Sequence, residues 1–284
     1  MAASTMKLKL LFFLVLSTTA ARAEPVRWDH PRFRPAEYVT TGAFAATLTA
    51  EILFLEQNLN GPSGGVLFDE AVTDAATLGS RSARDGAVAV GDAGFYSLMA
   101  FPVLDATVGV GAAHQSPDAA AQMLLIDAQA FAISGTISVG TQKLVGRKRP
   151  FLEHCAGDPS FDKDCDQLEA QSQSFLSGHT IIAFTGAGLG CAHHLNLDIY
   201  GSVADPLTCA LGLGVATWVG TSRIVSSRHY LSDVLSGAAL GLGSGWLMPT
   251  LLHYRTPLPT PTESSIVVPW VAGETLGVEW LGRL

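Results

Sequence analysis

The stretch SRIVSSRHYLSD, residues 222–233, places two arginines, a histidine and an aspartate between two long apolar segments. LGLGVATWVGT precedes it and VLSGAALGLGSGW follows it, so the stretch is expected to join two helices. A turn between helices needs no ionisable groups, and burying four of them costs free energy unless something binds them. His229 and Asp233 are four residues apart, which places them side by side on a helical turn. The stretch therefore indicates a junction that holds a ligand.

The N-terminus has the pattern of a secretory signal. Lys7 and Lys9 precede a short apolar run, and Ala-Arg-Ala at 21–23 is a small-x-small cleavage site, so we expect residues 1–23 to be removed before Glu24. The apolar run is too short to span a bilayer comfortably. The 284-residue chain has a net charge of −8, and removing this basic segment makes it more negative. Such a surface repels nucleic acid, which is excluded as a partner, and anionic lipid headgroups.

Four cysteines follow the predicted signal, and export makes disulfides plausible. Sequence-local pairing joins Cys155 to Cys165 and Cys191 to Cys209, but four cysteines allow three pairings and the sequence does not choose. CAHH, residues 191–194, lacks the second ligand cluster of a zinc site. DKDCD, residues 162–166, lacks the glycine and the final acid of a calcium loop. We therefore predict no metal and no cofactor.

Six apolar stretches rich in Ala, Gly and Leu predict helices, because they are too long for strands and show no strict alternation. They cover residues 37–57, 90–112, 119–145, 178–195, 207–224 and 233–252. Near the C-terminus, SSIVVPWVAGETLGVEWL predicts a β-hairpin that turns near Gly273, with Pro269 in an edge strand. The expected fold is all-α: a six-helix bundle over residues 24–256, then a proline-rich linker and hairpin over 257–284.

Two further polar clusters lie at predicted helix ends. GRKRPF, residues 146–151, closes the third helix, where a basic cap favoured by the helix dipole is the simplest explanation. SFLSGHT, residues 174–180, opens the fourth, where Ser177 is a reasonable N-cap. A helix N-terminus also binds anions, and His179 adds a titratable donor there. Because antiparallel helices bring both clusters and the 222–233 stretch to one end of the bundle, together they predict a site for a tetrahedral oxyanion.

These clusters resemble the motifs of the type 2 phosphatidic acid phosphatase (PAP2) superfamily, which includes class A acid phosphatases and vanadium haloperoxidases. The family pattern is K-x6-R-P, then P-S-G-H, then S-R-x5-H-x3-D. Order and spacing fit over residues 142–233, and the six-helix outline extends the resemblance over most of the mature chain. The matching residues are Arg149, Pro150, Ser177, Gly178, His179, Ser222, Arg223, His229 and Asp233.

The chain departs from the pattern at two positions. Leu176 stands where the family has proline, and Gln142 stands where it has lysine. Lys143 lies one position later, swung by roughly 100° about the helix axis. Gln142 can donate a hydrogen bond but carries no charge. Arg147 or Lys148 could compensate; otherwise we expect a lower phosphate affinity than in relatives.

The resemblance implies a metal-independent hydrolysis of phosphate monoesters, of lipids or of soluble molecules, through a phosphohistidine. His229 would attack phosphorus, Asp233 would orient His229, and His179 would protonate the leaving alkoxide and then activate water. The chemistry agrees, since a neutral nucleophilic histidine needs an orienting carboxylate and a separate acid across the phosphate. The implied phosphate-binding residues are Arg149, Arg223, Ser177, Gly178 and Gln142.

Two other functions remain open. A vanadium-dependent haloperoxidase would share these motifs, although such enzymes are usually much longer than this chain. A non-catalytic anion-binding envelope protein would be consistent with the departures at Gln142 and Leu176. The sequence does not indicate an oligomeric state.

Hydropathy gives weak support for membrane spans, because Glu51, Asp105 and Asp127 interrupt the apolar runs. Lipid phosphatases of the superfamily usually have six spans and an outward-facing site, whereas a cleaved signal followed by three spans would place Arg149 in the cytoplasm. The loops at the opposite end of the bundle from the motif clusters, AAHQSPDAA and HHLNLDIYGSVADP, contain no Lys or Arg. The excess of positive charge that marks cytoplasmic loops is therefore missing. We therefore expect an exported, periplasmic bundle, soluble or peripherally attached. The alternative is an inner-membrane protein with a periplasmic site.

Overall fold

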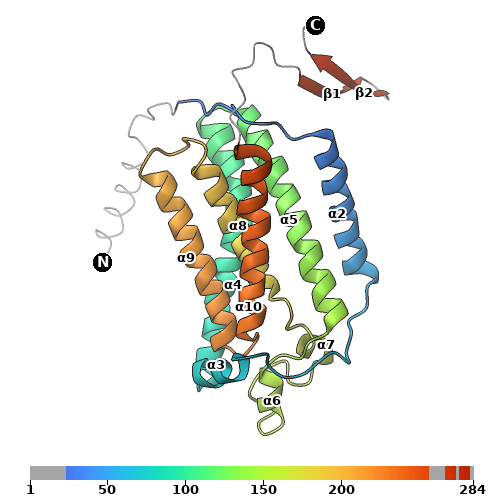
Figure 1. Ribbon diagram of the computed structural model, residues 1–284, viewed down its shortest axis with the longest axis vertical. Coiled ribbons are helices and arrows are strands. Elements are labelled where there is room, and N and C mark those ends of the chain that lie inside the picture. The colour runs from blue at the N-terminus through green and yellow to red at the C-terminus, as the bar shows by residue number, and fades with distance from the viewer. Residues whose placement is uncertain (1–23, 256–265, 273–274, 282–284) are drawn as a thin grey trace, which may run out of the picture.

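The computed structural model describes residues 24–255, 266–272 and 275–281. The predicted signal peptide, most of the proline-rich linker and the predicted hairpin turn lie outside these residues. Six long helical rods dominate the described part (Figure 1). They are α2 (Pro35–Phe54), α4 (Arg81–Leu104) with η1 (Asp105–Ala113), α5 (Pro117–Val145), α8 (Gly178–His194), α9 (Ala204–Val225), and α10 (Leu231–Leu242) with η2 (Gly243–Leu247) and η3 (Thr250–Tyr254). The label η marks a π-helical segment.

Three short helices add to the six that the sequence predicted. They are α3 (Asp69–Ala76), α6 (Phe151–Cys155) and α7 (Leu168–Gln171), and all three lie at the lower end of the bundle in Figure 1. The prediction of six helices was therefore incomplete, because the described residues contain nine α-helices. Helices of eight residues or fewer carry too little apolar periodicity to be recognised from a pattern.

The ends of the long helices follow from local sequence. Proline occupies the first turn of α2 and of α5, where its missing N–H would have had no partner. The Ser80 side chain accepts a hydrogen bond from the N–H of Ala83 and so caps α4. Gly146 ends α5 in the left-handed conformation, with φ of 63° and its N–H donating to the carbonyl of Gln142. This turn directs the chain that follows α5 across the lower end of the bundle.

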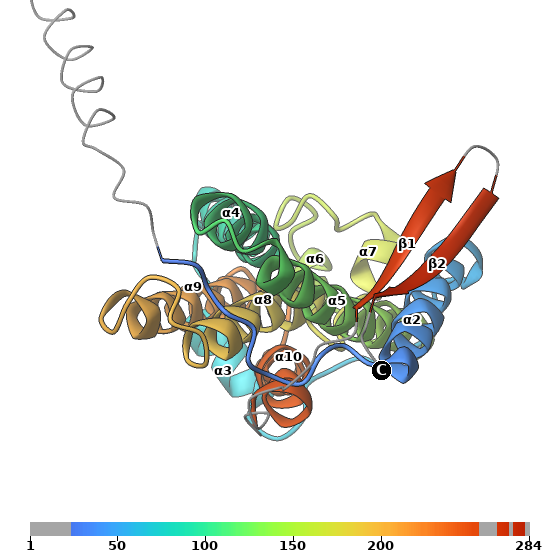
Figure 2. The ribbon, with the colours of Figure 1, turned by 90° about the horizontal axis from the view of Figure 1, so that it is seen from above.

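Helix α8 is the centre of the bundle. Figure 2 shows α4, α5, α9 and α10 around it, with α2 on the outer side of α5, and the contacts between helices agree. The packing is close because glycines face neighbouring backbone. A Cβ at Gly186 would lie 2.1 Å from the carbonyl oxygen of Leu98, and one at Gly245 would lie 2.1 Å from that of Thr185. The central helix therefore contacts its neighbours at backbone distance.

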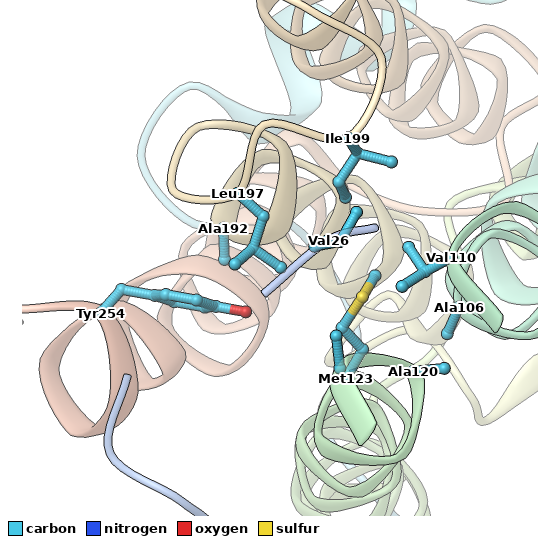
Figure 3. Packing of buried hydrophobic residues seen from close by; sticks show 10 residues of the cluster. Val26, Ala106, Val110, Ala120, Met123, Ala192, Leu197, Ile199 and Tyr254 are labelled. Atoms are coloured by element: carbon cyan, nitrogen blue, oxygen red, sulfur yellow. The ribbon is translucent and has the colours of Figure 1, made fainter. Parts of the chain in front are cut away.

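The upper end of the bundle is closed by an apolar cluster (Figure 3). It joins the segment before α2 to α5, η1 and the α8–α9 connection through Val26, Val110, Met123, Leu197 and Tyr254, among others. Beside it, buried histidines pair with buried carboxylates, which satisfies charges that would otherwise be costly. His193 Nε2 lies 2.8 Å from Asp127, and His194 Nδ1 lies 2.7 Å from Asp205. The two histidines of CAHH are thus bonded to carboxylates.

Each end of the bundle carries a disulfide. Cys155 is bonded to Cys165 at the lower end, and Cys191 to Cys209 at the upper end, so the sequence-local pairing is the one present. Strands β1 (Ile266–Ala272) and β2 (Thr275–Leu281) pair antiparallel, with Ala272 opposite Thr275. They are the two arms of the hairpin that the sequence predicted at the C-terminus.

Three helical segments are long and apolar enough to cross a membrane by length and composition: Arg81–Ala113, Pro117–Val145 and Leu231–Tyr254. This finding corrects the expectation of weak hydropathy. Asp105 and Asp127, which interrupt the apolar runs, are buried inside the bundle beside histidines and so do not reach its outer face. The outer faces of α4, α9, α10, η2 and η3 instead expose large apolar side chains: Val90, Tyr96, Met99, Val103, Leu104, Leu207, Leu211, Val215, Trp218, Leu235, Trp246, Leu247 and Leu251.

Candidate active site

All three motif clusters come together at the lower end of the bundle, as antiparallel helices require. A cavity of about 260 Å³ lies there between α4, α5 and α8. Its lining includes five of the predicted site residues, from all three clusters. The lining residues are Phe95, Ser138, Gln142, Arg149, Gln173, Gly178, His179, Ile182 and His229.

Arg149 presents a charged donor to this cavity. Its backbone N–H donates to the carbonyl of Gln171, which fixes the chain after α5 against the segment before α8. Its side-chain Nε is buried and has no hydrogen-bond partner within the described residues. Burial and the neighbouring Arg228 lower the pKa of Arg149 to about 10, so the guanidinium stays charged at neutral pH. A buried cation with an unused donor favours binding of an anion.

Arg223, in the last turn of α9, is almost fully buried. Its Nη2 donates to Asp92 Oδ1 at 2.7 Å and to the carbonyl of Val88 at 3.1 Å, both on α4. Its Nε donates to Ser222 Oγ at 3.2 Å. Burial lowers the pKa of Arg223, and the Asp92 carboxylate opposes that effect. Arg223 does not line the cavity directly, unlike Arg149.

His229 has the tautomer that a nucleophile needs. Its Nδ1 lies 2.7 Å from the carbonyl oxygen of Ser174, and only a protonated ring nitrogen can bond to a carbonyl. The lone pair therefore resides on Nε2. Burial, reinforced by the charge of Arg149, lowers the pKa of His229 well below its usual value, which keeps the ring neutral.

Asp233 acts on His229 through an intermediate group. Its Oδ2 is 3.9 Å from His229 Nδ1, beyond hydrogen-bond distance. The same oxygen accepts hydrogen bonds from Ser174 Oγ at 2.6 Å and from the N–H of Tyr230 at 2.9 Å, while Oδ1 accepts from Arg147 at 2.6 Å. Asp233 thus fixes the segment whose Ser174 carbonyl orients the imidazole.

His179 occupies the first turn of α8 and lines the same cavity as His229. Its Nε2 lies 3.3 Å from Asp92 Oδ1, and its ring is 4.6 Å from that of Phe95. Burial, followed by the charge of Arg223, lowers the pKa of His179 to about 4. The cationic cavity is therefore lined by two histidines, one with a defined lone pair and one beside a carboxylate.

Comparison with known proteins identifies a family to which part of the chain is similar. The sequence profile described as PAP2 superfamily matches residues 124–257, which run from α5 through α10 and include all three motif clusters. Residues 124–257 of this chain are therefore similar to the PAP2 superfamily.

Two relatives show how far the similarity extends. The chain is 36% identical over 126 residues to lipid A 1-phosphatase of Porphyromonas gingivalis, covering 44% of this chain and 23% of that protein. It is 32% identical over 126 residues to lipid phosphate phosphatase 2 of Arabidopsis thaliana, covering 39% of this chain and 43% of that protein. The chain therefore spans less than half the length of either relative. No solved structure is significantly similar to it.

The second PAP2 motif packs against Gln142. The Gln142 Nε2 donates to the carbonyl of Leu176 at 2.8 Å, and a Cβ at Gly178 would lie only 2.7 Å from that nitrogen. A side chain at 178 would therefore displace the Gln142 amide and the Ser138 hydroxyl. Ser177 is fully buried, and its hydroxyl lies 2.8 Å from that of Thr180, so its side chain does not line the cavity.

The basic residues near Gln142 are bound elsewhere. Lys143 donates to three carbonyls at the C-terminal end of α2: those of Glu51, Ile52 and Leu55. Lys148 donates to the Leu59 carbonyl and to Ser172 Oγ, and Arg147 pairs with Asp69 and Asp233. None of the three supplies the charge that the PAP2 lysine would bring to the cavity.

Sequence reasoning missed several residues of the site. Asp92 lies outside every PAP2 motif, and its only signal was a single acid within the apolar stretch of α4. Ser174 contributes a backbone carbonyl, which no side-chain pattern reveals. The acidic segment 162–166 has a role that the sequence did not show: Asp162 and Asp164 both pair with Arg228, the residue before His229.

Proposed function

We propose that this chain hydrolyses phosphate monoesters, with lipid phosphates as the substrate class, through a phosphohistidine formed on His229. One observation carries the proposal. The hydrogen bond from His229 Nδ1 to the Ser174 carbonyl leaves the Nε2 lone pair on a residue that lines the cationic cavity. A neutral histidine held in this tautomer is suited to attack phosphorus.

The proposed first step transfers the phosphoryl group to the protein. The Nε2 lone pair of His229 forms a bond to phosphorus while the bond from phosphorus to the ester oxygen breaks. His179 donates a proton to the departing alkoxide, which leaves as an alcohol. Arg149, which lines the cavity, neutralises the charge on the equatorial oxygens, helped by the hydrogen-bond donor of Gln142 and the N-terminus of α8 at Gly178. Arg223 does not line the cavity and adds positive charge from its place beside Asp92.

The second step regenerates the site. His179, now neutral, accepts a proton from a water molecule as that water attacks the phosphohistidine. The bond between phosphorus and Nε2 breaks, and inorganic phosphate leaves with the lone pair restored to His229. Asp233 keeps the Ser174 carbonyl in place throughout, so the imidazole retains its orientation.

Three features favour a lipid over a soluble ester. Phe95 and Ile182 form an apolar wall of the cavity. The outer faces of α4, α9 and α10 are apolar, and three helical segments are long enough to cross a membrane. Both relatives described above are named as phosphatases of lipids. We therefore propose a membrane-associated protein in which residues 24–256 form the phosphatase unit and 257–284 a separate tail.

We also propose that the protein is exported. A disulfide at each end of the bundle favours an oxidising compartment for both ends. Fractionation of a periplasm-containing host, with thiol labelling before and after reduction, tests this. Free thiols at both pairs, in protein isolated without reductant, would contradict export.

The activity itself is tested by phosphate release. The full chain in detergent or lipid discs is assayed with phosphatidate, a polyprenyl phosphate and p-nitrophenyl phosphate, beside the His229→Ala variant. We expect the wild type to release phosphate from the lipid phosphates with a higher kcat/KM than from p-nitrophenyl phosphate. The variant should release none. Release by His229→Ala equal to wild type would refute the nucleophile, and activity on the soluble ester alone would refute the substrate class.

A further inference from the structure

Asp92 connects two PAP2 motif clusters although it belongs to neither. It lies on α4, before the region that the superfamily profile matches. A single oxygen, Oδ1, is 2.7 Å from Arg223 Nη2 in the third cluster and 3.3 Å from His179 Nε2 in the second. The side chain is 38% exposed, so it stands at the edge of the site.

The position of Asp92 depends on the packing of α4 against α9. At the preceding residue, Gly91, a Cβ would lie 2.1 Å from Ser222 Oγ and 2.6 Å from Arg223 Nη2. A larger residue at 91 would displace the Ser222 and Arg223 side chains from their present positions. The Val88 carbonyl, one turn earlier on α4, also accepts a hydrogen bond from Arg223 Nη2. Two acceptors on α4 thus bind the guanidinium of Arg223, so the contact between α4 and α9 is specific at this point.

We propose that Asp92 is a positioning residue for the general acid: it binds His179 Nε2, so that Nδ1 is the nitrogen that exchanges the proton with the leaving group and with water. This inference rests on the proposed phosphatase function. A carboxylate acceptor keeps the proton on Nε2 in both charge states of the ring. The proton given to the alkoxide therefore leaves from Nδ1, and the proton taken from water returns there.

Asp92 also offsets the positive charge around His179. Burial lowers the pKa of His179 most, Arg223 from α9 and then Arg149 and Arg228 from the loops lower it further, and Asp92 is the neighbour that raises it. His229 lines the same cavity, and burial, followed by the charge of Arg149, lowers its pKa well below the usual value, so it stays neutral. Loss of the Asp92 charge should therefore move the alkaline limb of activity to lower pH.

The test is Asp92→Asn in the full chain, assayed with a series of phosphate esters that differ in leaving-group pKa. General acid catalysis contributes about 10²–10⁴-fold, and it matters most for poor leaving groups. We expect kcat for an alkyl or lipid phosphate to fall about 10- to 100-fold, and kcat for p-nitrophenyl phosphate to fall less than about threefold. Asp92→Glu should recover part of the loss. Asp85→Asn, on the same helix in an exposed pair with Arg81, is the matched control and should behave as wild type.

Two results would overturn the inference. An equal loss with good and poor leaving groups, with the alkaline limb unmoved, would mean that Asp92 only supports the structure. Tighter inhibition by inorganic phosphate together with a higher kcat/KM would mean that Asp92 competes with substrate for Arg223. A wild-type chain that releases no phosphate from any ester would instead refute the phosphatase function itself. Thermal unfolding of each variant shows whether it folds.

Discussion

Replacing Gln142 with lysine should tighten phosphate binding. Gln142 lines the cavity together with Arg149 and His179, and its amide nitrogen donates to the Leu176 carbonyl at 2.8 Å. A lysine ammonium has three donors, so it can keep a bond to that carbonyl and direct another toward a bound phosphate. The substitution adds the one charge that the family pattern contains and this chain lacks.

The magnitude follows from the change in bond type. A neutral hydrogen bond contributes about 1 kcal/mol net, and one to a charged group about 1.5–3 kcal/mol, so the gain is about 0.5–2 kcal/mol. At 1.4 kcal/mol per factor of ten this equals roughly a 2- to 30-fold decrease in the inhibition constant of inorganic phosphate. Repulsion from Arg149 and Arg223 acts against the gain, and we expect about fivefold.

The assay is competitive inhibition by inorganic phosphate in Gln142→Lys and in Lys143→Ala. Lys143 holds three carbonyls at the end of α2, so its loss should lower the free energy of unfolding by about 1–2 kcal/mol and leave the inhibition constant within about twofold. A large increase of the inhibition constant in Lys143→Ala, with no change in Gln142→Lys, would refute the register of α5 on which this reasoning depends.

Further predictions concern the nucleophile, its support, the lower disulfide and pH. Rapid quench with labelled substrate should trap an acid-labile, base-stable phosphoenzyme in wild type; label that persists in His229→Ala would assign it elsewhere. Asp233→Asn should cost about 3 kcal/mol in denaturant unfolding, because it removes one partner of buried Arg147, and should slow turnover; an unchanged midpoint and rate would contradict this. Replacing Cys155 and Cys165 with serine should lower the free energy of unfolding by about 3 kcal/mol, and an unchanged melting temperature would show that this disulfide does not stabilise the fold. The rate constant kcat/KM should fall as pH rises above the His179 pKa of about 4, because the general acid must be protonated. In the enzyme–substrate complex the negative phosphate favours the protonated ring, so the fall in kcat should occur at higher pH.

The long helices could be predicted from sequence because each carries an apolar run of many turns. The short ones could not, since α6 and α7 consist of five and four residues that pack only after the bundle forms. The expectation of weak hydropathy was wrong because the sequence does not show which charged residues are paired inside the bundle. Asp105 and Asp127 count as charges in any hydropathy window, whereas in the fold His194 and His193 pair with them inside the bundle.

Part of the candidate site could be predicted from the sequence and part could not. Residues of the three motifs could be placed together from their spacing and from antiparallel helix order. The partners of those residues could not, because Asp92 reaches Arg223 across 131 positions and Ser174 acts through its backbone. The expected contact between Asp233 and His229 shows the limit of the i, i+4 rule. The spacing is right, but the N-terminus of α10 turns the carboxylate toward Ser174 Oγ and the Tyr230 N–H.

The glycine contacts of α8 bear on how this protein can diversify. At Gly186 the backbone of α4 occupies the volume of a side chain, and at Gly245 the backbone of α8 does, so any larger residue would push α8 away from these neighbours. The seam between α4 and α5 is packed more sparsely, and Phe95 and Ser138 line the cavity beside it. Substitutions at Phe95 and Ser138 would therefore change the shape of the cavity for a new ester while Arg149, His179 and His229 stay in place.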